Sequence, residues 1–255
     1  MPEGDASVYV YGVLPGGVGS RMSIEGVEHA QVRTVEHAGL AALVSTLEGD
    51  ALAAAREVRA HWRVLESASK STTVLPVRFG TVLEGDRAVR ERLLEPNAER
   101  LTEMLDALAG RVQLNVSGDY DEERLLREVV RTSPQVAALR DRVSRLSDSA
   151  GYYDRIRLGE LVAAQVAAHR EQDAAHAIGR LEEFAVSARA EEISSEHGAF
   201  KLAFLVEAGE VDSFSEAVGR LREEFGEHVT LNYVGPLPPY SFADTDLSPG
   251  AAAWA

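Results

Sequence analysis

Two histidines on one predicted helix are the residues whose types and spacing come nearest to a metal site. His169 and His176 are seven residues apart, so both would face one ligand, with Glu171 or Asp173 to assist. A zinc site usually takes three or four protein ligands, and the sequence places no third ligand with this pair. We therefore interpret both histidines as solvated helix residues and expect neither a metal nor another cofactor.

Catalytic and phosphate-binding patterns are similarly incomplete. His61 has no partner at matching spacing, and Glu182 and Glu183 are more typical of a helix surface than of an acid–base pair. The glycine-rich residues 14–20 follow a predicted strand, but no lysine follows them at the spacing of a phosphate-binding loop. The chain has no cysteine, which excludes thiol nucleophiles, disulfides and thiolate zinc sites. We predict that the protein is not an enzyme.

The charge balance argues against nucleic acid and membranes as partners. The chain has 26 Lys and Arg against 41 Asp and Glu, a formal net charge of -15, so phosphate backbones and anionic lipids should repel it. No apolar run approaches the roughly 20 residues that span a bilayer, and the start of the chain is acidic rather than basic and apolar. We expect a cytoplasmic protein.

Residues 1–110 predict an α+β domain in which helices lie on an antiparallel sheet. Its expected elements are, in order, a strand at 7–12, a hairpin at 31–38 and 40–46, a helix from residue 50, a strand at 74–82, and helices at 84–94 and 97–108. The first helix would bury the apolar residues that recur three or four positions apart, namely Leu52, Ala55, Val58, Trp62 and Leu65.

Residues 111–243 predict a second α+β domain with an antiparallel sheet. Its expected elements are a strand at 112–116, helices at 122–131 and 136–146, one or two helices over 154–188, strands at 190–195 and 199–207, a helix at 211–225 and a strand at 229–234. This order is ferredoxin-like with an enlarged helical-hairpin crossover, and it places the last strand at a sheet edge. Residues 244–255 have nothing to bury, so we expect a disordered tail.

The most distinctive stretch is residues 231–242, LNYVGPLPPYSF. Leu231 and Tyr233 alternate with polar residues as in a strand, which Gly235 and Pro236 should end. Three prolines then fix the backbone, so the segment should run extended and present Tyr240 and Phe242 at defined positions.

Three motifs together resemble those of the gas vesicle protein F/L family. They are residues 231–242, residues 74–81 (VLPVRFGT) and residues 8–12 (VYVYG). Where that family often carries a tryptophan in the final proline run, this chain has Leu237. The resemblance spans nearly the whole chain and leaves membership of the F or the L branch open.

The resemblance implies an accessory protein of gas vesicle assembly, cytoplasmic and at the vesicle. It would bind the small shell protein and other accessory proteins, limit the aggregation of the shell protein, and be retained as a minor vesicle component or released. The alternative is a small-molecule sensor or an enzyme built on a ferredoxin-like sheet, because fold alone does not decide function.

Seven residues are candidate contacts, either with a partner or between the domains. They are Arg78, Phe79, Tyr233, Pro236, Pro239, Tyr240 and Phe242. Arg78 lies within an apolar strand pattern, so its guanidinium needs either a nearby carboxylate, such as that of Glu84 or Asp86, or a partner protein. Tyr240 and Phe242 could fill a groove between the domains or dock on another protein.

Overall fold

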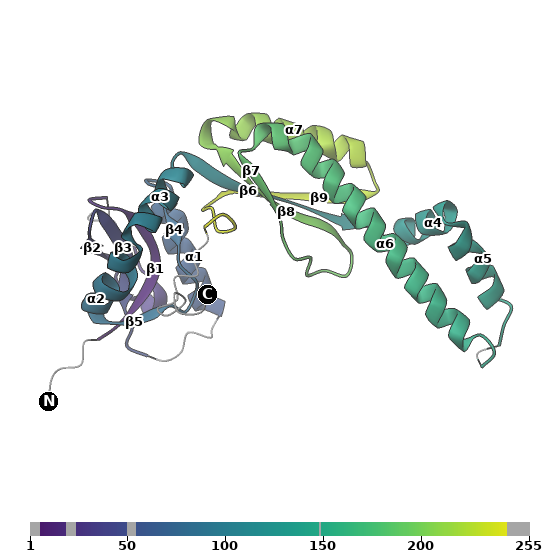
Figure 1. Cartoon of the computed structure of the whole chain (residues 1–255), viewed down its shortest axis with the longest axis horizontal. Coiled ribbons are helices and arrows are strands. Elements are labelled where there is room, and N and C mark those ends of the chain that lie inside the picture. The colour runs from purple at the N-terminus through teal and green to yellow at the C-terminus, as the bar shows by residue number, and fades with distance from the viewer. Residues whose placement is uncertain (1–5, 19–23, 50–54, 148, 244–255) are drawn as a thin grey trace. The chain divides into compact units, whose positions relative to one another are not determined.

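The computed structural model describes residues 6–18, 24–49, 55–147 and 149–243, which fold as two α+β units (Figure 1). The first unit contains the chain up to Gln113 together with the segment that begins at Pro236, and the second unit is Leu114–Gly235. The sequence predicts the boundary at residue 110 and residues 236–243 in the second domain, whereas the structure groups residues 236–243 with the first unit. The expected disordered tail, 244–255, lies outside the described residues.

The sheet of the first unit is built around β1 (Ser7–Pro15). Its order is β2-β3-β1-β4, where β2 is Arg33–His37, β3 is Leu40–Thr46 and β4 is Leu75–Pro76, and β5 (Val82–Glu84) also pairs with β1. All of these pairings are antiparallel. The predicted hairpin is confirmed, since β2 and β3 join at Gly39, whose φ of 79° is in the left-handed region that glycine adopts readily.

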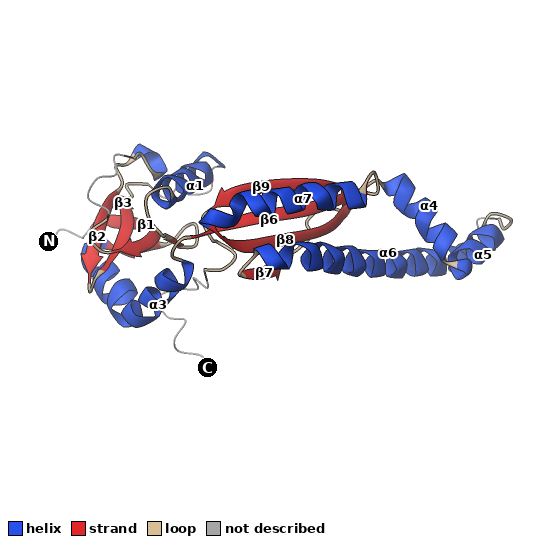
Figure 2. Cartoon of the chain, turned by 90° about the horizontal axis from the view of Figure 1, so that it is seen from above, coloured by secondary structure: helices blue, strands red, loops and turns tan. Residues whose placement is uncertain are grey.

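Helices cover both faces of this sheet, which explains why β1 is apolar on both sides. Figure 2 shows α1 (Ala55–Ser69) on one side and α3 (Ala98–Leu108) on the other. Between β5 and α3 the chain forms α2 (Gly85–Ala88), a π-helical turn η3 (Val89–Leu94) and a 3-10 turn η4 (Glu95–Asn97). A short 3-10 turn, η2 (Val27–His29), precedes β2.

The buried face of α1 differs from the predicted one. His61 and Leu65 are buried, whereas Val58 is 36% exposed and Trp62 is 42% exposed. Placing Trp62 in the core is therefore wrong. The reason is that β1 presents two tyrosines to α1, and a buried polar side chain that can hydrogen-bond to a tyrosine fits there better than an indole.

The strand predicted at 74–82 is also wrong as a single element. β4 and β5 both pair with β1, but the chain between them forms a turn in which the Thr81 N–H donates to the Arg78 carbonyl at 3.2 Å. Gly80 takes a φ of 89°, which interrupts the extended backbone. The turn lets the Gly80 N–H donate to the Tyr9 hydroxyl at 3.2 Å.

The second unit has a four-stranded sheet with the order β7-β8-β6-β9. These strands are β6 (Arg111–Tyr120), β7 (Ser187–Ala190), β8 (Gly198–Glu207) and β9 (Val229–Leu237). The helices are α4 (Glu122–Thr132), α5 (Pro134–Val143), α6 (Tyr152–Leu181) and α7 (Val211–Phe225), with 3-10 turns η5 (Glu182–Phe184) and η6 (Ala208–Glu210).

The expected order of elements is present, and the α+β class with antiparallel sheets is confirmed. The ferredoxin-like assignment stays a prediction from that order. Residues 154–188, predicted as one helix or two, contain the single helix α6, against which α4 and α5 pack. Figure 2 shows α7 lying over the sheet and running along its strands, and Phe214 and Leu221 of this helix join Phe204 of β8 in the core. No helix in the described part of the chain has the length and apolarity needed to cross a bilayer.

The proline-rich segment departs from expectation in two ways. β9 continues to Leu237 instead of ending before Gly235, and the chain then turns instead of running extended. An edge strand has no ladder partner on one side, so Pro236 is tolerated although it lacks an N–H. After the strand, the N–H groups of Phe242 and Ala243 both donate to the Pro239 carbonyl, at 3.0 and 2.9 Å, which closes a helical turn.

Candidate protein-contact site

A buried cluster of two tyrosines and a histidine forms the base of the site in the first unit. Alternation along β1 puts Tyr9 and Tyr11 on the face that α1 covers, and both are fully buried with ring centroids 4.8 Å apart. His61 projects from α1 so that its Nδ1 lies 2.9 Å from the Tyr9 hydroxyl and its ring stacks on Tyr11. We call these three residues the tyrosine cluster.

Burial keeps the tyrosine cluster uncharged. Loss of hydration on burial lowers the pKa of His61 to about 4. A hydrogen bond with the Val77 backbone raises this pKa, but by less than burial lowers it. Burial also raises the pKa of Tyr9 and Tyr11. The Tyr9 hydroxyl thus shares a hydrogen bond with Nδ1 of a neutral His61 and accepts another from the Gly80 N–H. Sequence reasoning missed this partner because Tyr9 lies 52 positions away along the chain.

A buried carboxylate holds the loop beside this cluster. Glu57, 4% exposed, accepts from the backbone N–H of Glu28 at 2.9 Å and from Arg56 Nε at 2.6 Å. These two interactions, the backbone one first, lower the pKa of Glu57. Glu28 itself has a φ of 53°, and its carboxylate accepts from the N–H groups of Glu48 and Gly49. The carboxylates therefore fix a strained turn and are not arranged as a catalytic pair.

The proline-rich turn packs onto this base. Tyr240 joins the apolar cluster that contains Tyr9 and Phe79, and its ring centroid lies 4.1 Å from that of Trp62. The Tyr240 hydroxyl is buried and finds no hydrogen-bond partner within the described residues, and burial raises its pKa. The outer side of the Trp62 ring thus stays exposed while its inner side rests on Tyr240.

One glutamine fixes the turn to the first unit. Gln113 is 2% exposed, and its side-chain carbonyl accepts from the Ser241 N–H at 2.8 Å while its amide donates to the Ser241 hydroxyl at 2.9 Å. Both side-chain groups of a buried amide are thereby satisfied. Sequence reasoning did not single out Gln113, because its partner lies 128 positions away.

The outer face of α1 combines this tryptophan with arginines. A shallow hollow of about 420 Å³ is lined by Arg56, Arg59, Trp62, Arg63 and Glu66. Arg56 pairs with Glu57, whereas Arg59 and Arg63 have no ion pair with any residue that the structure describes. We call Arg59, Trp62 and Arg63 the Trp62 surface. Tryptophan and arginine are enriched at the centres of protein–protein interfaces.

The seven candidate residues are not all brought together. Phe79 lies in the first unit with its ring 5.6 Å from His61, and Pro239 is buried in the turn. Pro236 is exposed and Phe242 is half-buried. Tyr233 instead belongs to the second unit, where its hydroxyl lies 2.9 Å from Ser215 Oγ.

Arg78 does not form the ion pair expected for it. The carboxylate of Glu84 is 3.4 Å from Arg92, and Asp86 makes two hydrogen bonds to Arg33, at 2.9 and 2.6 Å. Arg78 is exposed on its turn and has no ion pair in the described ranges. The predicted ion pair between Arg78 and Glu84 or Asp86 is therefore wrong.

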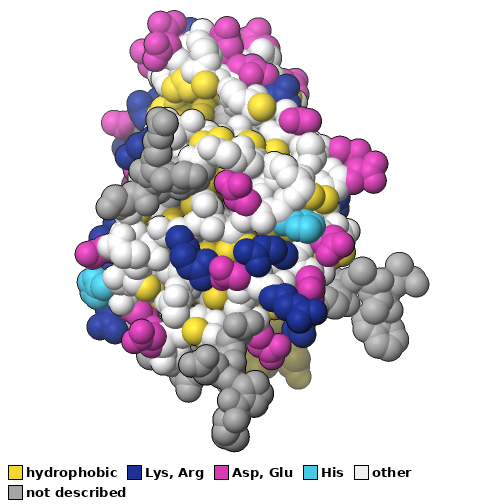
Figure 3. Space-filling model, turned by 90° about the vertical axis from the view of Figure 1, so that its left-hand side faces the viewer, with side chains coloured by type: hydrophobic (Ala, Val, Ile, Leu, Met, Phe, Trp, Pro, Cys, Tyr) yellow, Lys and Arg dark blue, Asp and Glu magenta, His cyan; other side chains and the backbone are white. Residues whose placement is uncertain are grey.

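Basic side chains form a group among acidic ones on the face of the molecule shown in Figure 3, despite the net charge of -15.

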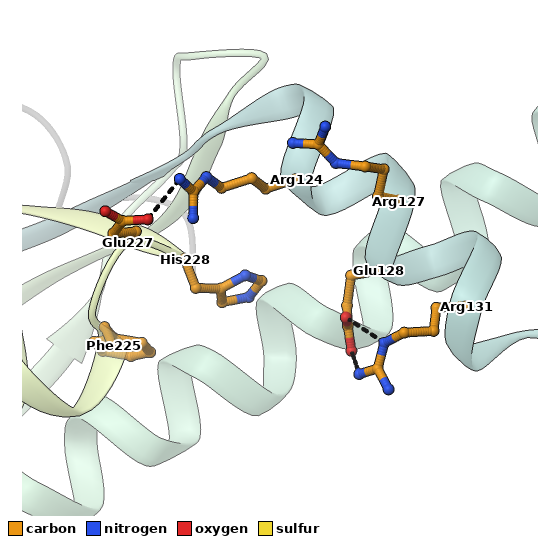
Figure 4. Close-up of a pocket in the computed structure, with 7 residues that line it drawn as sticks. All are labelled: Arg124, Arg127, Glu128, Arg131, Phe225, Glu227 and His228. Atoms are coloured by element: carbon orange, nitrogen blue, oxygen red, sulfur yellow. Dashed lines mark hydrogen bonds and ion pairs between the residues drawn. The ribbon is translucent and has the colours of Figure 1, made fainter.

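A second hollow, of about 560 Å³, lies in the second unit between α4 and the turn before β9 (Figure 4). Its lining residues are Arg124, Arg127, Glu128, Arg131, Phe225, Glu227 and His228. Each arginine has a carboxylate partner: Glu128 is bidentate with Arg131, Glu227 is 2.5 Å from Arg124, and Glu123 is 3.7 Å from Arg127. Because these charges neutralise one another, the hollow has no free cationic group to bind an anion.

The histidines considered as metal ligands have other contacts. His176 Nε2 lies 2.9 Å from Glu224, which also pairs with Arg180, and the His169 ring lies 6.5 Å from that of His228. Across the described residues, no group of three or more metal-binding side chains comes together. His176 is thus an exposed residue of α6 that contacts Glu224, and His169 is half-buried on the same helix.

Comparison with known proteins gives one consistent family. The sequence profile of "Gas vesicle synthesis protein GvpL/GvpF" matches residues 7–244. Gas vesicle protein F of Streptomyces sp. (strain CB03234) is 34% identical over 245 residues, which cover 93% of this chain and 100% of that protein. The alternative of a small-molecule sensor or enzyme is not favoured by these matches.

Solved structures agree with the sequence comparison. The crystal structure of GvpF from Anabaena sp. PCC7120 matches with a TM-score of 0.81 and 25% identity, covering 93% of this chain and 98% of that chain. GvpF from Microcystis aeruginosa has the same fold, with a TM-score of 0.79 and 23% identity over 93% of this chain and 99% of that chain. The resemblance seen in the sequence motifs is confirmed, and the chain belongs to the GvpL/GvpF family of gas vesicle synthesis proteins.

Proposed function

We propose that this protein is a non-enzymatic accessory factor that binds the small shell protein of the gas vesicle and limits its aggregation during assembly. Membership of the GvpL/GvpF family gives it a role connected with gas vesicles. The observation that carries the finer proposal is the exposed ring of Trp62, held in place by Tyr240 and flanked by arginines. A rigid aromatic residue beside arginine side chains is the composition of an interface centre.

The physical need for such a factor follows from the nature of a gas-filled shell. A wall that excludes liquid water must present a strongly apolar face, and subunits with such a face associate indiscriminately before they are incorporated. A partner with a large net charge, here -15, that covers part of this face would keep the complex dispersed through charge repulsion. The factor would act in the cytoplasm and at the growing vesicle, stay there as a minor component, and also contact other accessory proteins.

The candidate contacts divide between two roles under this proposal. Arg78 and Pro236 are exposed, so they would touch a partner directly. Phe79, Pro239, Tyr240 and Phe242 would support the surface from below, since they are wholly or partly buried in the first unit. Tyr233 would hold β9 against α7 through Ser215 in the second unit.

A deletion strain tests the role in the cell. Loss of the protein should abolish vesicles or leave few of them, and expression of the unchanged chain from a plasmid should restore them. The matched test uses Trp62→Ala, which should restore fewer vesicles than Tyr153→Ala, a change at an aromatic residue that is 82% exposed in the second unit. Normal vesicles in the deletion strain would refute the proposal.

A further inference from the structure

The Trp62 surface combines two arginines that have no ion pair within the described residues with an aromatic ring that is held in place. Arg59 and Arg63 are four positions apart on α1 and have no ion pair within the described part of the chain. Some other exposed arginines of α-helices in this protein find carboxylates, such as Arg87 with Glu91 and Arg131 with Glu128, whereas Arg157 and Arg222 have no ion pair within the described residues. Arg59 and Arg63 differ from Arg157 and Arg222 because they lie one helical turn apart beside an exposed tryptophan that Tyr240 supports.

The spacing of these arginines defines the chemistry of an occupant. Residues four apart on a helix are separated by about 6 Å along its axis, and an α-helix in the occupant repeats the same spacing. Two carboxylates at positions i and i+4 of an antiparallel helix would therefore meet Arg59 and Arg63 together. An apolar side chain between them would enter the hollow of about 420 Å³ beside Trp62. The guanidinium group of arginine binds a carboxylate through two parallel hydrogen bonds. Carboxylates therefore suit Arg59 and Arg63 better than an anion that accepts only one hydrogen bond.

We propose that the Trp62 surface docks an acidic amphipathic helix of a protein partner, with carboxylates at i and i+4 paired to Arg59 and Arg63 and an apolar residue packed on Trp62. The mode is a helix laid against an exposed helix face, with the aromatic ring as anchor. The inference rests on the proposed function for the class of partner, a protein, and adds which surface and which partner chemistry are used.

The proline-rich turn is part of this docking surface. Tyr240 supports the inner side of Trp62, and Gln113 fixes the turn that carries Tyr240. An indole that is already held in one orientation loses less conformational entropy when a partner binds than a free one would. The surface thus requires both α1 and the segment that returns from β9.

The experiment titrates the full chain with a synthetic helical peptide that carries two glutamates at i and i+4 around one leucine. A Trp254→Phe background leaves Trp62 as the sole tryptophan, so its fluorescence reports docking directly. We expect saturable binding with a Kd below about 1 mM, and this affinity should fall as salt is added. Replacing the two glutamates by glutamine, or the leucine by alanine, should each weaken binding by about tenfold.

Charge reversal in the protein supplies the matched test. Arg59→Glu with Arg63→Glu should weaken binding of the acidic peptide by at least about tenfold and improve binding of a peptide with lysines in place of the glutamates. Arg145→Glu with Arg157→Glu makes the same change in net charge at two exposed positions of the second unit and should leave both affinities unchanged. No binding by the unchanged chain, or equal binding by the Arg59/Arg63 variant, would overturn the inference.

A separate readout distinguishes this inference from the proposed function. The unchanged chain and the Arg59/Arg63 variant are each tested for co-purification of the shell protein. If the variant retains the shell protein but fails to bind the peptide, the docked helix belongs to another partner. If the unchanged chain binds the peptide but never retains the shell protein, the docking surface stands and the proposed function fails.

Discussion

The ring of Trp62 lies on the ring of Tyr240, with centroids 4.1 Å apart, so a residue of the first helix and a residue near the end of the described chain form one aromatic unit. The contact makes the proline-rich turn a structural part of the first unit. It also leaves one side of Trp62 free, because the ring is 42% exposed. A substitution of Tyr240 therefore tests what holds the Trp62 ring in place, whereas substitutions on the exposed side of the ring test binding of a partner.

Replacing Tyr240 by Ala should lower the free energy of unfolding by roughly 2 kcal/mol, because it removes a ring that packs on Trp62 and on the cluster with Phe79. Phe242→Ala should cost about 1 kcal/mol, since Phe242 is only half-buried. Chemical denaturation followed by fluorescence measures both. Tyr153→Ala is the control, because a tyrosine that is 82% exposed should change stability by less than about 0.5 kcal/mol. Equal stability of all three variants would show that the turn is not held by its aromatic residues.

Gln113→Ala should destabilise the protein by about 1 to 3 kcal/mol, because Gln113 is buried and holds both the N–H and the hydroxyl of Ser241. The Ser241 amide should then exchange its hydrogen faster, which hydrogen-exchange mass spectrometry over residues 236–243 measures. Gln172→Ala changes an exposed glutamine of α6 and should affect neither quantity. Unchanged exchange in the Gln113 variant would contradict the role of this side chain.

Stability should fall as the pH drops from about 6.5 to about 4, because His61 is neutral when folded, with a pKa of about 4, whereas the unfolded chain takes up a proton near 6.5. The unfolded state binds more protons in this window, so the contribution is fully present above it and amounts to at most about 3 kcal/mol. The lowered pKa of Glu57 acts in the same direction at still lower pH, as its carboxylate is protonated.

Urea unfolding at pH 7 and pH 5 measures this dependence. His61→Gln should flatten the slope between these two values, because it removes the group that takes up a proton on unfolding. A slope in the His61 variant that equals that of the unchanged chain would place the titrating group elsewhere in the molecule.

Arg78→Ala should change the free energy of unfolding by less than about 0.5 kcal/mol and so leave the melting temperature nearly unchanged. The reason is that Arg78 is exposed and that the carboxylates expected to pair with it are bound to Arg92 and Arg33. We expect it to reduce retention of the shell protein, as a direct contact would. Lys70→Ala, at an exposed residue paired with Glu66, is the control for loss of a surface charge. Normal retention by the Arg78 variant would remove this residue from the interface.

Local patterns in the sequence predicted most of the strands and helices, because strand alternation, helix periodicity and turn glycines act within a few residues. Gly39 marked the hairpin correctly for that reason. The same rules failed for α1, where apolar periodicity favoured Trp62 for the core while the tyrosines of β1 select His61. No property of residues 55–69 alone encodes that preference.

The candidate site was predicted only in part, for a similar reason. Tyr240 could be singled out by its rigid proline context, but the partner of its ring and the bond from Gln113 to Ser241 depend on folding of distant segments. The path of the chain after β9 was missed because an edge strand tolerates Pro236, which sequence rules treat as a stop. Arg59 and Arg63 could not be singled out from the sequence, because their position beside an exposed Trp62 exists only in the folded protein.

Co-purification with the small gas vesicle shell protein is the sharpest test of the proposed role in vesicle assembly. The tagged chain and the shell protein are produced together, and the shell protein is measured in the eluate and in the sedimented fraction. The unchanged chain should retain the shell protein and lower the amount that sediments, and it should lose both effects on Trp62→Ala but not on Tyr153→Ala. A shell protein that sediments equally with and without the chain, and is absent from the eluate, would contradict it.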